Sequence, residues 1–281
     1  MKRYFLKEED KQIRVTEWGE RGKPVIFCLH GLGSTSLSFI EIAEQLKEDY
    51  RLIAIDAPGH GKTSAFPSGE QYEMDNMVDW LNNVIDQLDI DHFYFLSHSW
   101  GSFVALFYVR KFESRVRGSI LIDGGYQTKR LAGQSMEEEV AYYEKDFDEY
   151  VFEDWEGFFS REKEAYTRWS PLLEKAVKDL GVERDNKVRW HMRGKDAGHI
   201  IRAMHKNETE DIYQSLSSNI LLLRATLPER VEVQRKNTAE TFQQKTGGTV
   251  KVVSNTTHML HWDNPTIVVN EIKKYCNEGN R

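Results

Sequence analysis

The chain has 281 residues, a formal net charge of −7, 40% hydrophobic residues and a mean hydropathy of −0.61. These values are typical of one soluble, enzyme-sized domain, and the acidic balance favours neither nucleic acid nor an anionic membrane as a partner. No apolar run approaches the length that spans a bilayer, the start lacks the apolar stretch of a secretory signal, and the two cysteines do not make a disulfide framework. We therefore expect a cytoplasmic protein, monomeric or homodimeric, that acts on a small molecule.

Strand-like and helix-like segments alternate in the first half of the chain. Residues 12–18 alternate polar and apolar side chains, as a half-buried strand does. Short apolar runs follow at 24–29, 50–55, 93–96 and 116–122, and helical spacing occurs at 34–47, 74–88 and 100–111. Because fully apolar strands alternate with helices, the pattern indicates a parallel sheet covered on both faces.

The middle of the chain, residues 126–214, differs in character because it has no run typical of a buried strand. Charged residues are interleaved with aromatic ones, which are Tyr142, Tyr143, Phe147, Tyr150, Phe152, Trp155, Phe158, Phe159, Tyr166, Trp169 and Trp190. We interpret this segment as a helical cap, inserted after the sixth strand and lying over the carboxyl edge of the sheet. The aromatic content suggests an apolar substrate pocket, although most of these rings are expected to pack the cap onto the sheet.

The alternation resumes after the insertion, with apolar runs at 219–225 and 249–254 and helical segments at 231–245 and 266–275. The predicted fold class is therefore α/β, a mostly parallel, doubly wound sheet. Residues 1–125 and 215–281 would form its core, and residues 126–214 would form the cap within the same domain. No internal repeat or long linker suggests a second independent domain.

One motif dominates the chemistry: Ser-His-Ser-Trp-Gly at residues 97–101, between an apolar run and a helical segment. A serine in a tight strand-to-helix turn is the geometry of a nucleophile elbow, which lifts the Ser99 hydroxyl clear of the sheet edge. The pattern is usually Gly-x-Ser-x-Gly, and Ser97 stands at the first glycine position. Serine is small, so we interpret it as a tolerated variant.

A serine hydroxyl needs an adjacent base to become a nucleophile at neutral pH. His258 is the best candidate, because it follows an apolar strand run and precedes the terminal helix. That position places it on the carboxyl edge of the sheet, where open α/β sheets place their sites. His261 is the fallback.

These motifs together resemble the α/β-hydrolase family with a cap domain. The resemblance rests on His-Gly-Leu-Gly at 30–33, Asp-Ala-Pro-Gly-His-Gly at 56–61, the elbow at 97–101 and the loop that carries His258, all in the order of the family. It covers nearly the whole chain outside the cap. The resemblance implies that the backbone N–H groups of Leu32 and Trp100 form an oxyanion hole.

The acid that orients the base departs from the commonest family pattern. No aspartate follows the apolar run at 219–225, where Glu229 is the nearby carboxylate. A second family position lies at the end of the sixth strand, and Asp123 stands there, followed by two glycines. We prefer Asp123, since Glu229 also fits the first turn of a helix, where a carboxylate is favoured by the helix dipole. Glu229 remains the alternative acid.

Cofactor and metal sites are not expected. The histidines at 191, 199 and 205 lack regular zinc-ligand spacing, and no cysteine accompanies them. The glycines at 31 and 33 do not complete Gly-x-Gly-x-x-Gly, because position 36 is serine. The run at 59–63 ends like a phosphate loop but lacks its first glycine, since position 56 is aspartate.

The sequence thus predicts a cofactor-free serine hydrolase, carboxylesterase-like, that cleaves carboxylic esters of small to medium, largely apolar substrates through an acyl-serine. One alternative is an amidase or aminopeptidase, which an acidic pocket for a substrate amine would favour. Glu153, Asp154 and Glu156 make that pocket conceivable, but a charge run is usually a solvated face. Another alternative is a slow-turnover small-molecule receptor on the same fold. Epoxide hydrolase and dehalogenase chemistry is disfavoured, since similar enzymes have Asp where this chain has Ser99.

Overall fold

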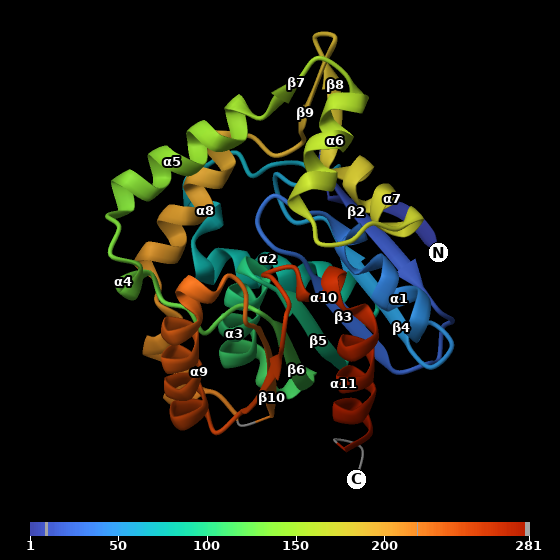
Figure 1. The fold of residues 1–281 in the computed structure, drawn as a ribbon. Helices are drawn as coiled ribbons and strands as arrows, with labels where there is room; N and C mark the ends of the chain where they lie inside the picture. The colour runs from blue at the N-terminus through green and yellow to red at the C-terminus, as the bar shows by residue number, and fades with distance from the viewer. Residues whose placement is uncertain (9–10, 218, 279–281) are drawn as a thin grey trace.

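A computed structural model describes residues 1–8, 11–217 and 219–278. Its central sheet has the strand order β1-β2-β4-β3-β5-β6-β10-β11 (Figure 1). The strands are β1 (Lys2–Glu8), β2 (Lys11–Trp18), β3 (Val25–Leu29), β4 (Arg51–Ile55), β5 (Phe93–His98), β6 (Val116–Ile122), β10 (Ile220–Ala225) and β11 (Thr249–Val253). β2 is antiparallel to β1 and β4, and the other pairs are parallel. The predicted mostly parallel α/β sheet is confirmed.

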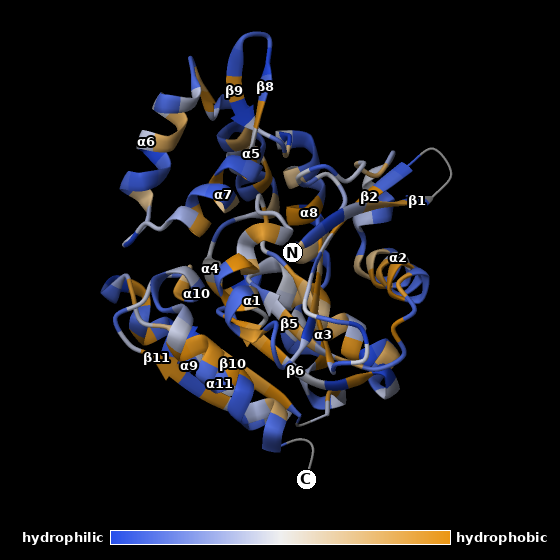
Figure 2. Cartoon of the chain, turned by 90° about the vertical axis from the view of Figure 1, so that its right-hand side faces the viewer, coloured by the Kyte–Doolittle hydropathy of each residue, from blue (hydrophilic) through white to orange (hydrophobic). Residues whose placement is uncertain are grey.

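Helices cover both faces of this sheet. They are α1 (Ile40–Leu46), α2 (Met74–Gln87), α3 (Trp100–Phe112), α9 (Glu232–Thr246) and α11 (Pro265–Glu278), with α10 (Leu260–Asp263) before the last. Phe27 and Leu29 point to the side of α2, α3 and α9, whereas Ile26 and Cys28 point to the side of α1 and α11. Both sides are therefore buried, which explains why these strands are continuous apolar runs. Figure 2 shows hydrophobic residues concentrated in the strands.

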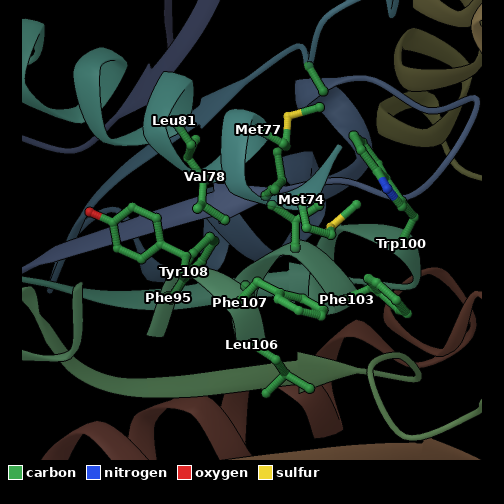
Figure 3. Packing of buried hydrophobic residues seen from close by; sticks show 14 of the residues in the cluster. Met74, Met77, Val78, Leu81, Phe95, Trp100, Phe103, Leu106, Phe107 and Tyr108 are labelled. Atoms are coloured by element: carbon green, nitrogen blue, oxygen red, sulfur yellow. The ribbon is translucent and has the colours of Figure 1, made fainter. Parts of the chain in front are cut away.

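The helix that follows the elbow is anchored by packing on its neighbour. In Figure 3, Phe103 and Phe107 of α3 lie beside Met74 and Met77 of α2, and all four belong to one buried cluster. Ten of the thirteen residues of α3 are buried. A helix held this firmly fixes the position of its first turn, and with it the serine that precedes the turn.

The chain between β6 and β10 forms a separate layer above the sheet in Figure 1. Its helices are α4 (Lys129–Ala132), α5 (Met136–Glu149), α6 (Trp155–Ala165), α7 (Pro171–Leu180) and α8 (Gly194–Lys206), and its strands are β7 (Val151–Phe152), β8 (Gly181–Arg184) and β9 (Lys187–Trp190). The same stretch ends in the 3₁₀ segment η4 (Thr209–Ser215). Shorter 3₁₀ segments elsewhere are η1 (Ser36–Phe39), η2 (Gly69–Tyr72), η3 (Glu113–Arg115) and η5 (Glu229–Val231). We call residues 126–214 the inserted segment.

One expectation about secondary structure was wrong, and one strand was not predicted. The inserted segment is not wholly helical, because β7, β9 and β8 form a small antiparallel sheet. Its strands have only two to four residues and are mostly half-exposed, so no buried run marks them. The missed signal is the turn at Asp185 and Asn186, which both have positive φ (55° and 58°), as a tight hairpin requires. β1 was also missed, because the side chains of residues 2–7 are exposed or half-buried and several are charged.

None of the helices among the described residues combines the length and apolar character that a bilayer crossing requires. The two cysteines, Cys28 and Cys276, are free and buried.

Candidate active site

Ser99 lies in a strained turn between β5 and α3. Its backbone has φ +53° and ψ −120°, a conformation that L-residues seldom adopt. The Ser99 N–H donates to the carbonyl of Ile122 at 3.0 Å, which ties the turn to the end of β6. This is the geometry of a nucleophile elbow, as the motif at 97–101 predicts.

Glycines make room for this turn. A Cβ on Gly101 would lie 2.3 Å from the Leu29 carbonyl oxygen, and one on Gly124 would lie 2.3 Å from the Ser99 carbonyl oxygen. The second contact was not predicted, although the Gly-Gly pair after Asp123 was its sequence signal. Ser97 fits at the usual glycine position because its hydroxyl donates to the Ser102 hydroxyl at 3.1 Å, both being buried.

His258 and Asp123 complete a hydrogen-bonded series with the serine. His258 Nε2 lies 2.8 Å from Ser99 Oγ, and His258 Nδ1 lies 2.8 Å from Asp123 Oδ2. Since a carboxylate can only accept, Nδ1 carries the proton and Nε2 is free to accept from the serine. The three side chains follow β5, β6 and β11, so they meet at the carboxyl edge of the sheet.

Asp123 is almost wholly buried, at 1% exposure. Its Oδ1 accepts from the Tyr126 hydroxyl at 2.8 Å and from the Ala225 N–H at 3.1 Å. Arg235 of α9 approaches Oδ2 at 3.5 Å. Burial alone would raise the pKa of Asp123, but hydrogen bonds and charges, first from His258 and then from Arg235, hold it below the ordinary value. The carboxylate is therefore ionised at neutral pH.

The structure does not bring the alternative residues to the serine. Glu229 lies exposed in η5, and the acid on His258 is Asp123. The fallback base, His261, is buried on the other side of His98, and its Nε2 contacts Ser38 Oγ at 2.9 Å. His261 is thus placed as a packing residue, so the fallback was wrong.

Buried histidines surround the series. His98 Nε2 donates to the His258 carbonyl at 3.0 Å, which steadies the loop that carries the base. Burial, followed by the neighbouring His258, lowers the pKa of His98 to about 3. His30 accepts the Ala57 N–H at 3.0 Å and contacts the Gly31 carbonyl at 2.8 Å, so it orders the loop that leads to Leu32.

Leu32 and Trp100 lie beside Ser99, as the resemblance implies, and both line its cavity. Trp100 is the first residue of α3, so its N–H has no partner within the helix. The helix N-terminus also places positive potential there. These two positions can therefore offer backbone donors to a developing oxyanion.

The cavity at Ser99 has a volume of about 260 Å³. The lining residues are Leu32, Ser99, Trp100, Phe103, Asp123, Gly124, Gly125, Gln127, Thr128, Lys129, Tyr143, Ile201, Met204, Gln234, Thr238 and His258. A larger hollow of about 470 Å³, lined by residues that include Lys2, Arg21 and Arg51, lies at the edge strand β1 and its neighbour β2. Volume alone therefore does not identify the site.

Most aromatic residues of the inserted segment serve packing rather than the cavity, as expected. Of the eleven aromatic residues singled out in the inserted segment, Tyr143 alone lines the cavity that the structure describes. The others pack among themselves and against the core, as when the rings of Tyr150 and Trp190 stack at 4.3 Å. The inserted segment contributes Ile201 and Met204 of α8 as apolar walls. Polar groups come from residues 127–129, at the start of the same segment, and from α9 of the core.

No group of three or more His, Cys, Asp or Glu side chains within the described ranges could hold a metal ion. Two of the three histidines of the inserted segment have separate partners: His199 stacks on Tyr72, and His205 contacts Glu139 at 2.6 Å.

A strained serine at an elbow, a histidine on its hydroxyl and a buried carboxylate behind the histidine, all on one sheet edge, define the class of α/β hydrolases. A family model described as "alpha/beta hydrolase fold" matches residues 24–265. The chain therefore belongs to the α/β-hydrolase family.

The chain is also similar to individual proteins. It is 34% identical over 113 residues to a serine hydrolase-like protein of Danio rerio, covering 40% of this chain and 34% of that protein. It is 28% identical over 100 residues to epoxide hydrolase 4 of Mus musculus, covering 36% of this chain and 28% of that protein. The matches thus span about a third of these relatives' length.

A solved structure, that of E-2-(acetamidomethylene)succinate hydrolase, superimposes with a TM-score of 0.79 at 18% identity, covering 98% of this chain and all of that one. At this identity the likeness shows the fold alone.

Proposed function

We propose that this α/β hydrolase is a serine hydrolase that cleaves carboxylic esters of small to medium size through an acyl-serine intermediate. The observation that carries the proposal is the 2.8 Å contact between Ser99 Oγ and His258 Nε2, with Asp123 on the opposite nitrogen. In this arrangement Ser99 Oγ attacks the ester carbonyl while its proton passes to His258. Asp123 orients the imidazole and stabilises the imidazolium.

The carbonyl oxygen becomes negative as the tetrahedral intermediate forms. The N–H groups of Leu32 and Trp100 would bind it, and each such donor contributes about 3 kcal/mol in the transition state. His258 then returns the proton to the leaving alcohol, which departs and leaves the acyl-serine. Water, deprotonated by His258, releases the acid and regenerates Ser99.

The serine at position 99 supports acyl transfer over epoxide opening, although one relative is named an epoxide hydrolase. A hydroxyl that shares its proton with a histidine is the nucleophile suited to a carbonyl carbon. The cavity also gives little support to an aminopeptidase. Among its described lining residues, Asp123 is the carboxylate, and it is already bound to His258. Glu153, meanwhile, pairs with Lys187 at 2.8 Å and does not line the cavity.

The cavity size and walls indicate the substrate range. About 260 Å³ accommodates a short or medium acyl or alcohol group. Ile201, Met204 and Phe103 offer apolar contacts, whereas Gln127 and Gln234 offer hydrogen bonds. We therefore expect a preference for short esters over long-chain ones.

The test is hydrolysis of p-nitrophenyl esters from acetate to dodecanoate by the wild type, by Ser99→Ala and by Ser102→Ala. We expect turnover that Ser99→Ala lowers by about 10⁴-fold or more. Ser102→Ala is the matched control, since Ser102 is buried on the same helix and bonds to Ser97 rather than to His258. Equal rates for wild type and Ser99→Ala on every ester would contradict the proposal and leave amides or a receptor role to be examined.

A further inference from the structure

A buried arginine stands behind the acid of the site. Arg235 of α9 places Nη2 3.5 Å from Asp123 Oδ2, and the two side chains are 8% and 0% exposed. Its Nη1 donates to the Leu227 carbonyl, which fixes the guanidinium. Its Nε has no hydrogen-bond partner among the described residues. A buried cation with so few partners needs a reason, because leaving water is unfavourable for a charge.

Asp123 is the carboxylate that faces this cation. The neighbouring arginine, Arg224 of β10, is also buried, but Glu232 holds it with two contacts of 2.8 and 2.9 Å. No second carboxylate pairs with Arg235 in the part of the chain that the structure describes. The charge of Arg235 is therefore directed at the acid of the site.

The other titratable groups around this pair are few. Asp123 also meets His258 and the hydroxyl of Tyr126, and burial raises the pKa of that hydroxyl so that it stays neutral. His258 meets His98 and, beyond it, His261. Burial lowers the pKa of both neighbours, so both are uncharged near pH 7.

Lys129 also lines the cavity, but it pairs with Glu139. The charges in line behind the imidazole are thus one anion, Asp123, and one cation, Arg235. A positive charge behind Asp123 favours the carboxylate over the neutral acid, and it disfavours a second positive charge on His258. Arg235 would therefore keep the acid ionised and oppose a second positive charge on the imidazole. An imidazole that stays neutral remains able to accept the serine proton at lower pH.

We propose that Arg235 is a positioning residue which, through Asp123, aligns the acid on His258 and extends the working range of the site toward lower pH. This inference rests on the proposed serine-hydrolase function. Arg235 does not line the cavity, and we assign it no contact with substrate.

The first test compares pH profiles of kcat/KM for the wild type, Arg235→Met and Arg235→Lys between pH 5 and 9. We expect Arg235→Met to move the acid limb upward by about one pH unit, so that kcat/KM falls about tenfold more at pH 6 than at pH 9. Arg235→Lys keeps the positive charge, so its acid limb should lie close to that of the wild type. Arg224→Met is the matched control, because it removes a buried arginine that pairs with Glu232, and its limb should move by less than half as much.

If Arg235→Met lowers kcat/KM by the same factor at every pH and the acid limb does not move, the inference is overturned. Loosened packing alone would cause such a uniform loss. Thermal unfolding of each variant at every pH of the profile shows whether the folded state is retained there, so that a loss caused by acid unfolding is not taken for a shift of the limb.

A second readout does not need turnover. The imidazole resonances of ¹³C-labelled histidines, with His258 assigned by His258→Gln, give the titration midpoint of His258 directly. A midpoint raised by about one unit in Arg235→Met supports the inference even if the wild type hydrolyses no ester. An unchanged midpoint in an active enzyme overturns the inference and leaves the proposed function intact.

Discussion

The carboxyl edge of the sheet and the inserted segment differ in how their side chains are used. At the sheet edge, three strands deliver Ser99, Asp123 and His258 to one series with contacts of 2.8 Å. In the inserted segment, most aromatic rings contact one another, as the stack of Tyr150 on Trp190 illustrates. The difference teaches that the sheet determines the chemistry, whereas most of the inserted segment's apolar residues stabilise that segment.

Substitutions should therefore act differently in the two regions. A change at the sheet edge should alter kcat, because it removes a group that acts in the transition state. A change in the inserted segment should alter stability, unless the residue lines the cavity.

The largest effect separates the two candidate acids. We expect Asp123→Asn to lower kcat by about 10³- to 10⁴-fold, since the amide would favour the wrong tautomer of His258. Glu229→Gln should leave kcat within about twofold, because surface changes away from a site have little effect. Steady-state kinetics on one p-nitrophenyl ester measures both. A slow Glu229→Gln beside a normal Asp123→Asn would reverse the assignment.

The next effect is the acid stability of the sheet edge. Burial lowers the pKa of four histidines in the folded state, which are His30, His60, His98 and His261. In the unfolded state the same side chains bind protons below about pH 6.5. Stability should therefore fall as pH falls from 7 to 5, by about 1.4 kcal/mol per pH unit for each such histidine at full effect.

Urea unfolding at pH 7, 6 and 5 measures this loss. His261→Gln, which can keep a hydrogen bond to Ser38, should make the pH dependence shallower by about one proton. A free energy of unfolding that stays level from pH 7 to 5 would show that these histidines are not held neutral.

The smallest effect compares two half-buried residues of the inserted segment. Met204→Ala removes part of the cavity wall, so we expect KM for a butyrate ester to rise about threefold to tenfold. Phe159→Ala removes a ring that packs on Trp155 and Phe158, so it should lower the melting temperature and change KM by less than about twofold. Equal KM changes in both variants would mean that the aromatic cluster also shapes the cavity.

The sequence predicted the central strands of the sheet well because these are buried on both faces. Such strands are apolar throughout, as in Leu52 to Ile55, and the turns at their ends carry the polar residues of the site. The order of the motifs then identified Ser99, His258 and the preferred position of Asp123, which the structure brings together.

The remaining features depend on contacts between distant segments. The approach of Arg235 to Asp123 spans more than one hundred residues, and nothing local distinguishes this arginine from its charged neighbours in α9. The short strands β7 to β9 are mostly half-exposed, so they lack an apolar run. Which aromatic rings line the cavity depends on helix orientation, so the sequence could not single out Tyr143.

The most direct test of the central claim is covalent labelling with a fluorophosphonate, which phosphonylates an activated serine and expels fluoride. Mass spectrometry of the digested protein should find one adduct, on Ser99, and His258→Gln should suppress it in a folded variant. Ser99→Ala should carry no adduct. A folded wild type that remains unlabelled, or that is labelled at another serine, would contradict the account of Ser99 as a nucleophile activated by His258.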